Sequence, residues 1–150
     1  MTLKPCVYIP NEVVRATLGN TPAPGKRQLE PFKALAAGTA VNILEDHRIL
    51  DNQVEVHRHE ADLWICLEGE ADFTVGGELV GAWAKEGDDR ELKAPTDGIV
   101  GGTRHTLRRG DVLWIPAGQP HVHTAKDTAR LYIVKVPQAE VPLSEVPGWK

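Results

Sequence analysis

From Thr39 onward the chain is built of short runs of strand-forming residues separated by glycine and proline. Short runs bounded by turn residues are typical of strands that pack in an antiparallel sandwich or a small barrel. We expect strands at residues 40–44, 53–57, 63–67, 71–75, 112–115, 121–124 and 131–136. Nothing in this stretch alternates strands with helix-length amphipathic segments, so alternating βαβ units are excluded. The pattern predicts an all-β fold.

The segments on either side of this β-rich region differ from it. A length of 150 residues predicts one domain. Before Thr39 we expect a short strand at Val7–Ile9, a helix from Asn11 to Leu18 and a second short helix from Pro31 to Ala37. We therefore divide the chain into an N-terminal arm (1–38), a barrel (39–137) and a C-terminal tail (138–150). Residues 75–103 contain a charged run at 85–91 and are expected to form a hairpin extension with a polar tip.

Charge and composition exclude several partners. The chain has 17 Lys and Arg against 21 Asp and Glu, a formal net charge of −4, and its basic residues are scattered. Nucleic acid is therefore excluded as a partner, because phosphate backbones are bound by clustered positive charge. No apolar run is long enough to span a bilayer, which excludes a membrane partner. The start of the chain lacks a secretory signal, and Cys6 and Cys66 are read as reduced thiols, so we expect a cytoplasmic protein.

Three histidines occur at spacings that metal binding would require. His57 and His59 are separated by one residue, and side chains alternate across a strand, so both are expected on one face. Asp62 follows close behind them, next to an apolar run. Some fifty residues later, a Pro/Gly turn leads into His121 at the start of another expected strand. An antiparallel barrel would bring His121 beside the first pair.

These two segments resemble the two motifs of the cupin superfamily. In the first motif, His57, His59 and Asp62 occupy the ligand places and Gly69 the final glycine. The second motif is matched in order by Gly110, Pro116, Gly118 and His121. The resemblance covers roughly residues 51–125, about half of the chain. It implies a cupin-type double-stranded β-helix, or jelly-roll barrel, that holds one divalent metal ion through His57, His59, His121 and the carboxylate of Asp62.

The sequence departs from the family pattern at several places. Asp62 stands where cupins usually have glutamate and lies closer to His59, so a salt bridge at the barrel mouth remains the alternative role for it. Asp51 replaces the first glycine and Ala125 the last asparagine, and the gap between the motifs is long. His123 shares a face with His121 by alternation, and it is a candidate catalytic acid or base, with packing behind the metal ligands as the alternative.

A metal ion with three imidazoles and one carboxylate keeps open positions for a substrate. Such a ligand set suits Fe(II) or Mn(II), which we favour, or Ni(II) or Zn(II). We therefore predict a metal-dependent enzyme that acts on a small oxygen-rich metabolite, a keto or hydroxy acid or a sugar derivative, as an isomerase, lyase or dioxygenase. The alternative is a non-catalytic cupin that binds a small ligand as a sensor or storage protein. We also expect a homodimer, because small cupins commonly pair through sheet edges.

Overall fold

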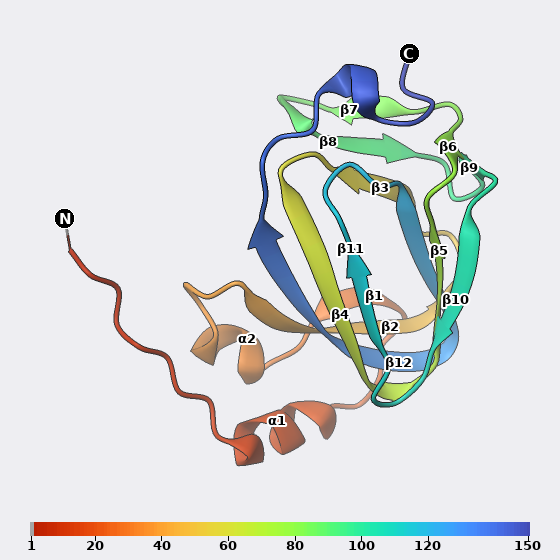
Figure 1. The fold of residues 1–150 in the computed structure, drawn as a ribbon. Helices are drawn as coiled ribbons and strands as arrows, with labels where there is room; N and C mark the ends of the chain where they lie inside the picture. The colour runs from red at the N-terminus through yellow and green to blue at the C-terminus, as the bar shows by residue number, and fades with distance from the viewer. Residues whose placement is uncertain (1) are drawn as a thin grey trace.

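Two antiparallel sheets that share one long strand form the barrel in the computed structural model, which describes residues 2–150 (Figure 1). The shared strand is β12 (His121–Pro137). Its C-terminal part pairs with β2 (Val41–Ile49) on one side and β4 (Glu60–Gly69) on the other. The first sheet ends in β1 (Gly25–Gln28), which pairs with β2, and in β11 (Val112–Ile115), which pairs with β4.

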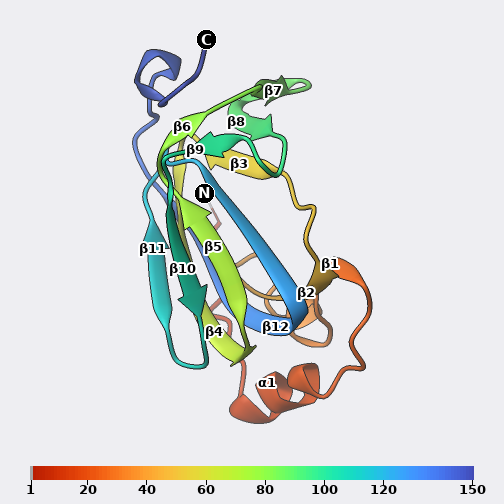
Figure 2. The same cartoon turned by 90° about the vertical axis from the view of Figure 1, so that its right-hand side faces the viewer.

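The second sheet contains the N-terminal part of β12. On one side, β12 pairs with β5 (Ala71–Val75), and β5 pairs with β10 (Thr103–Leu107); Figure 2 shows these three strands side by side. On the other side, β12 pairs with β3 (Val54–His57), followed by β8 (Asp88–Ala94) and β7 (Trp83–Lys85). The strands β6 (Glu78–Leu79) and β9 (Ile99–Val100) form a separate ribbon. The predicted all-β jelly-roll architecture is confirmed.

The apolar residues lie in three places. The main core fills the space between the sheets and includes Phe73, Ile115 and Leu131. A second cluster packs β3 and β8 against the C-terminal tail, where the short 3-10 helix η1 (Leu143–Glu145) lies. A third covers the outer side of β2 with the helices α1 (Asn11–Leu18) and α2 (Phe32–Leu35). The tail and the helices thus cover surfaces that the strands alone would leave exposed.

The structure differs from the predicted elements mainly in the N-terminal arm. Val7–Ile9 is extended chain that pairs with no strand, whereas Gly25–Gln28, a polar segment without a strand pattern, pairs with β2. Both predicted helices are present, the second one shorter than expected. The predicted polar hairpin corresponds to β7 and β8, with its turn at Glu86 and Gly87. None of the helices within residues 2–150 is long and apolar enough to cross a membrane.

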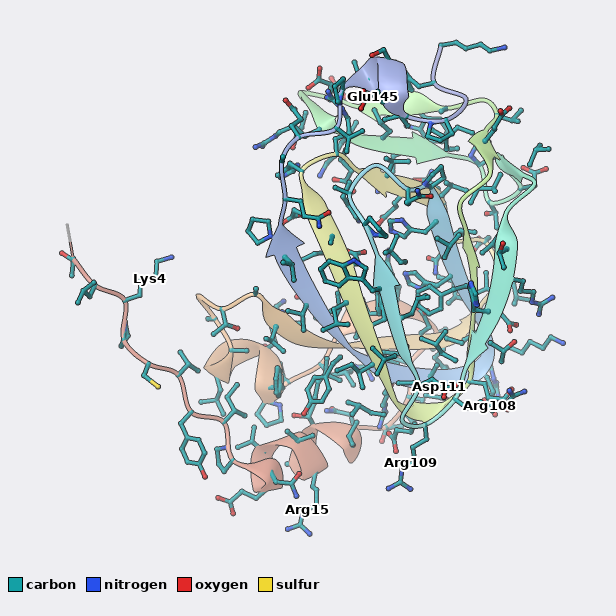
Figure 3. The ribbon with its side chains drawn as sticks, viewed as in Figure 1. Lys4, Arg15, Arg108, Arg109, Asp111 and Glu145 are labelled. Atoms are coloured by element: carbon teal, nitrogen blue, oxygen red, sulfur yellow. The ribbon has the colours of Figure 1, made fainter. Side chains whose placement is uncertain are left out.

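Different segments lie at the two ends of the barrel (Figure 3). The turn between β10 and β11 carries Arg108, Arg109 and Asp111 at the end opposite to Glu145 and the C-terminal tail. In this turn the backbone N–H of Arg108 donates a hydrogen bond of 2.8 Å to Oδ2 of Asp111. This turn connects the two sheets, because β10 belongs to one and β11 to the other.

Candidate metal centre

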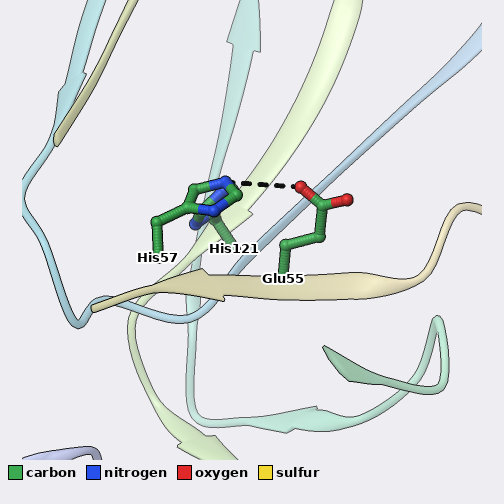
Figure 4. Close-up of side chains that lie close together, drawn as sticks. All are labelled: Glu55, His57 and His121. Atoms are coloured by element: carbon green, nitrogen blue, oxygen red, sulfur yellow. Dashed lines mark ion pairs between the residues drawn. The ribbon is translucent and has the colours of Figure 1, made fainter. Parts of the chain in front are cut away.

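Strand alternation on β3 places two polar side chains toward the cavity of the barrel. Val54 and Val56 are fully buried in the core beneath β8, so Glu55 and His57 lie on the opposite face. His121, the first residue of β12, lies directly across from Glu55 in the strand register. Cross-strand neighbours share a face, and the ligand atoms of Glu55, His57 and His121 all lie within 4.8 Å of one another (Figure 4). These three residues form a His/Glu group suited to a metal ion.

Asp62, on β4, lies beside the two histidines of this group. Its Oδ2 atom is buried and has no hydrogen-bond partner, and it lies 3.6 Å from Nε2 of His57 and 3.4 Å from Nε2 of His121. A buried carboxylate oxygen without a partner is costly. A cation between the three groups would satisfy it, and ligands at ~2.1 Å from a tetrahedral ion lie ~3.4 Å apart. The residues present therefore fit a divalent metal ion.

Lysines orient both carboxylates. Lys135 lies directly opposite Asp62 in the register of β12 and β4, and its Nζ donates a hydrogen bond of 2.6 Å to Oδ1. On Glu55, Oε1 accepts a hydrogen bond of 2.9 Å from Nζ of Lys93, while Oε2 lies 3.4 Å from Nε2 of His57. Each carboxylate thus has one oxygen held by an ammonium group and the other turned toward an imidazole nitrogen. This arrangement presents one oxygen of each carboxylate to the centre.

The same contacts keep both carboxylates charged. Burial raises the pKa of Asp62, but its interactions with His121 and His57 in their protonated forms, and with Lys135, outweigh burial and hold the pKa well below its usual range. Burial likewise raises the pKa of Glu55, and the contacts with His57, Lys26 and Lys93 lower it further than burial raises it. Both groups are therefore ionised at neutral pH, as metal ligands must be.

His121 is held in the tautomer that a metal ligand needs. Its Nδ1 atom lies 3.0 Å from the carbonyl oxygen of Gln119, and a carbonyl oxygen only accepts, so Nδ1 carries the proton. The lone pair of His121 is then on Nε2, the atom that faces Asp62. Such a backbone partner on the far nitrogen is the usual way in which proteins fix a metal-binding histidine.

His59 lies outside the group formed by Glu55, His57 and His121. Strand β3 ends at His57, and Arg58 and His59 form a bend before β4 begins. The alternation that was expected to place His59 beside His57 requires a continuous strand, and the bend ends it. Nδ1 of His59 is buried without a hydrogen-bond partner. Its role as a ligand stays a prediction. The same alternation, applied two residues before His57 instead of after it, indicates Glu55, which sequence reasoning missed.

A cavity of about 780 Å³ adjoins this group. Among the side chains that line it are Glu55, His57, Asp62, Trp64, His123 and Lys135. Nδ1 of His123 lies 2.5 Å from Oδ2 of Asp46, and the imidazole packs against Trp64, with ring centroids 5.0 Å apart. Since the Asp46 carboxylate accepts the Nδ1 proton, the Nε2 atom of His123 is the one available to a ligand. Asp46 was not foreseen, because it lies on β2 in the first sheet, whereas the part of β12 that carries His123 belongs to the second sheet.

The remaining histidines and Cys66 lie elsewhere. Nδ1 of His47 lies 2.7 Å from Oγ1 of Thr128, and His105 is exposed on β10. Cys66 is buried in the main core, and burial raises the pKa of its thiol. Trp64 belongs to the same core and also lines the cavity.

Comparison with known proteins bears on the fold. Searches of protein-family models and of curated sequences gave no significant match. Similar solved structures include an oxalate oxidase in complex with glycolate, with 20% identity over 82% of this chain and 57% of that one and a TM-score of 0.49. A cupin-superfamily sugar phosphate isomerase from Silicibacter pomeroyi shares 14% identity over 75% of this chain and 59% of its own, with a TM-score of 0.49. The CENP-C cupin domain of Drosophila melanogaster shares 10% identity over 64% and 56%, with a TM-score of 0.45.

The structures to which the chain is similar include cupin-domain and double-stranded β-helix proteins. The chain spans less than two thirds of the three solved chains described above. The similarity concerns the fold, and the chemistry of this chain has to be argued from its own residues.

Proposed function

We propose that this chain is a metal-dependent enzyme acting on a small oxygen-rich metabolite, such as a keto or hydroxy acid or a sugar derivative. The observation that carries the proposal is Oδ2 of Asp62, buried without a partner, facing Nε2 of His57 and of His121 beside a cavity. His57, His121 and Asp62 would hold one divalent transition-metal ion, with Glu55 as a further candidate ligand from the structure and His59 as the further predicted ligand. Mixed imidazole and carboxylate donors suit Fe(II) or Mn(II), which we favour, and also Ni(II) or Zn(II).

When bound, such an ion supplies Lewis-acid chemistry, polarising a carbonyl or hydroxyl oxygen of a chelating substrate. The protein supplies the proton transfer. His123 lines the cavity and would take or give a proton at Nε2, while Asp46 holds the proton on Nδ1 and stabilises the charged imidazolium. Leu44, Trp64 and Ile133 add apolar walls that limit water around the reacting atoms. Proton transfer beside a metal ion favours an isomerase or lyase, with a dioxygenase as the remaining type.

The alternative function is non-catalytic binding of a small ligand. Both proposals use the metal centre and the cavity, but only the enzyme needs a proton acceptor at His123. We expect His123→Gln to keep metal and ligand binding while turnover falls by about 10²–10⁴-fold, the usual contribution of a general acid or base. A ligand that binds the wild type without being converted would support the sensor or storage function instead.

The metal centre is tested by comparing wild type with His121→Ala. Both are purified without added metal, analysed for bound elements, and melted with and without a chelator. Metal that binds only the folded chain stabilises it by about 4 kcal/mol at a thousandfold excess over Kd, so chelation should lower the Tm of wild type by roughly 10 °C. His121→Ala should carry little metal and respond weakly. Equal metal content and equal response in the two proteins would end the metal-centre proposal and the enzyme proposal with it.

A further inference from the structure

We infer that Lys135 couples occupation of the metal centre to binding of an anionic group, a carboxylate or a phosphate, in the adjoining cavity. The inference rests on the proposed metal centre and adds a substrate class to it. Lys135 lines the cavity, and its side chain is 36% exposed, so the ammonium group is open to a ligand while remaining in contact with the candidate metal ligands.

The contacts of the ammonium group provide the coupling. An ammonium group donates up to three hydrogen bonds. Nζ of Lys135 donates one to Oδ1 of Asp62, at 2.6 Å, and lies 3.3 Å from Nε2 of His57. The lone pair on that nitrogen is the one that His57 would give to a metal ion. Once Nε2 of His57 binds the ion, its lone pair no longer accepts a hydrogen bond from Lys135. One N–H group of Lys135 is then left without a partner next to the ion.

The net charge of the cavity lining changes sign when the metal ion binds. Three cationic side chains line the cavity: Lys26, Arg27 and Lys135. Four carboxylates line it as well: Glu55, Glu60, Asp62 and Glu91. A divalent ion adds two positive charges, so the lining becomes positive overall when the centre is filled. Fields of this kind attract ligands of the opposite sign. A carboxylate or phosphate that binds the ion at an open coordination position would also accept a hydrogen bond from the free N–H group of Lys135.

Because binding equilibria are linked, the effect must be reciprocal. If the metal ion increases the affinity for the anion through Lys135, the anion increases the affinity for the metal ion by the same factor. The coupling can therefore be measured with the metal ion alone as the reporter. No substrate or turnover assay is needed.

The experiment titrates the chelator-stripped protein with Mn(II) and follows the loss of the free-ion signal by electron paramagnetic resonance. Each titration is done without additive, with L-lactate and with propane-1,2-diol, which has the same carbon skeleton as lactate but no charge. Mn(II) binding by lactate itself is measured in a blank without protein and subtracted from each titration. The proteins are wild type, Lys135→Met, Lys135→Arg and the control Lys126→Met, which changes an exposed lysine of the same strand outside the cavity.

We expect lactate to tighten Mn(II) binding by roughly fivefold or more in wild type and in Lys126→Met, within the usual range of coupling between sites. Lys135→Met should reduce this factor to less than about twofold, and Lys135→Arg should keep part of it, because a guanidinium also donates to an anion. The uncharged diol should have no effect on any of the proteins. Thermal melts confirm that each variant is folded.

The possible failures are distinguishable. If lactate does not tighten Mn(II) binding in wild type, or tightens it equally in folded Lys135→Met, the coupling is absent while the metal centre stands. If wild type binds no Mn(II) in the titration without additive, and elemental analysis of the purified protein finds no other transition metal, the proposed function falls and this inference falls with it. A retained effect in Lys135→Arg together with a loss in Lys135→Met assigns the coupling to the positive charge.

Discussion

The two oxygens of Asp62 have different surroundings, and this difference defines the centre at the scale of single residues. Oδ1 accepts a hydrogen bond from Lys135, and Oδ2 faces two imidazole nitrogens with no hydrogen-bond donor of its own. A surface salt bridge would leave the second oxygen in water. The Asp62 side chain is instead only 1% exposed. If Asp62 made only a salt bridge at the barrel mouth, its second oxygen would lose its hydration without gaining a partner, which is unfavourable.

Single replacements should therefore rank the ligands. We expect His57→Ala, His121→Ala and Asp62→Asn each to lose most of the bound metal, because each removes a donor that faces the same point. Glu55→Gln and His59→Ala form the decisive pair, and we expect Glu55→Gln to lose more metal, since Oε2 of Glu55 lies 3.4 Å from Nε2 of His57. Elemental analysis of the purified variants measures this. His105→Ala, at an exposed position, is the control and should keep its metal. A larger loss in His59→Ala than in Glu55→Gln would contradict the ranking.

The sequence allowed part of this centre to be predicted. The motifs named His57, Asp62 and His121, and the structure brings these three together. Lys135 and Asp46 could not be found in this way, because Lys135 meets Asp62 only through the register of β12 with β4, and Asp46 meets His123 only where the first sheet packs against the second. Local residue patterns determine which face a side chain takes, but the pairing of distant strands determines which residues become neighbours.

At the scale of elements, Gly69 allows β4 to turn against β12. Its φ is +71°, and a Cβ atom there would lie 1.8 Å from the carbonyl oxygen of Thr128. We expect Gly69→Ala to lower the free energy of unfolding by more than about 3 kcal/mol, since backbone strain and a backbone clash act together. Gly87→Ala separates the two effects. Its φ is +77° with open space around it, so only strain of about 1–2 kcal/mol applies. Urea unfolding of both variants measures the difference, and equal losses would exclude the clash.

A buried ion pair connects the N-terminal arm to the barrel. Nε and Nη2 of Arg130 on β12 donate to Oε2 of Glu45 on β2, at 2.9 and 2.7 Å. Arg130 also donates to the backbone carbonyls of Leu18, the last residue of α1, and of Asn20. We expect Glu45→Gln to destabilise the fold by about 3–5 kcal/mol, because it leaves a buried guanidinium short of its partner. Glu68→Gln, at the half-exposed contact of the same arginine, should cost no more than about 1 kcal/mol.

The same pair should make stability depend on pH. Burial raises the pKa of Glu45, but hydrogen bonds from Arg130 and Arg27 lower it further, so the folded pKa lies below the usual value of 4.5. A depressed carboxyl pKa contributes stability that is present above the unfolded value and is lost as pH falls through the folded value. Wild type should thus lose stability more steeply than Glu45→Gln below about pH 4.5. Parallel curves of unfolding free energy against pH would show that Glu45 is not responsible.

The strands of the barrel were predicted better than their connections. The runs at 121–124 and 131–136 were expected as two strands because the residues between them resemble a turn. In the structure they form one strand with an irregularity between Ala125 and Thr128. A bulge keeps the strand continuous while bending it from one sheet into the other, and only the partners on both sides make this visible.

At the scale of the whole molecule, the predicted homodimer stays a prediction. Residues 2–8 of the arm are exposed, with Leu3 and Tyr8 more than 80% accessible. Val112 and Trp114 are exposed on β11, an edge strand of the first sheet. Exposed apolar groups on an edge strand favour pairing with another chain. Light scattering should give the mass of a dimer at micromolar concentration, and deleting residues 2–8 should shift the equilibrium toward the monomer. A monomer at all concentrations would overturn the prediction.

The long strand β12 also has a consequence for how the centre can change. It supplies His121, His123 and Lys135, and it is paired on both sides at His121 and over residues 129–134. The segment 129–134, which is held on both sides, should not fray locally, so its amide hydrogens should exchange only when the whole chain unfolds. The cavity then keeps its backbone geometry until global melting. New specificity would have to arise there through replacement of side chains on an unchanged backbone, since a shift of the strand would break the pairing that holds both sheets together.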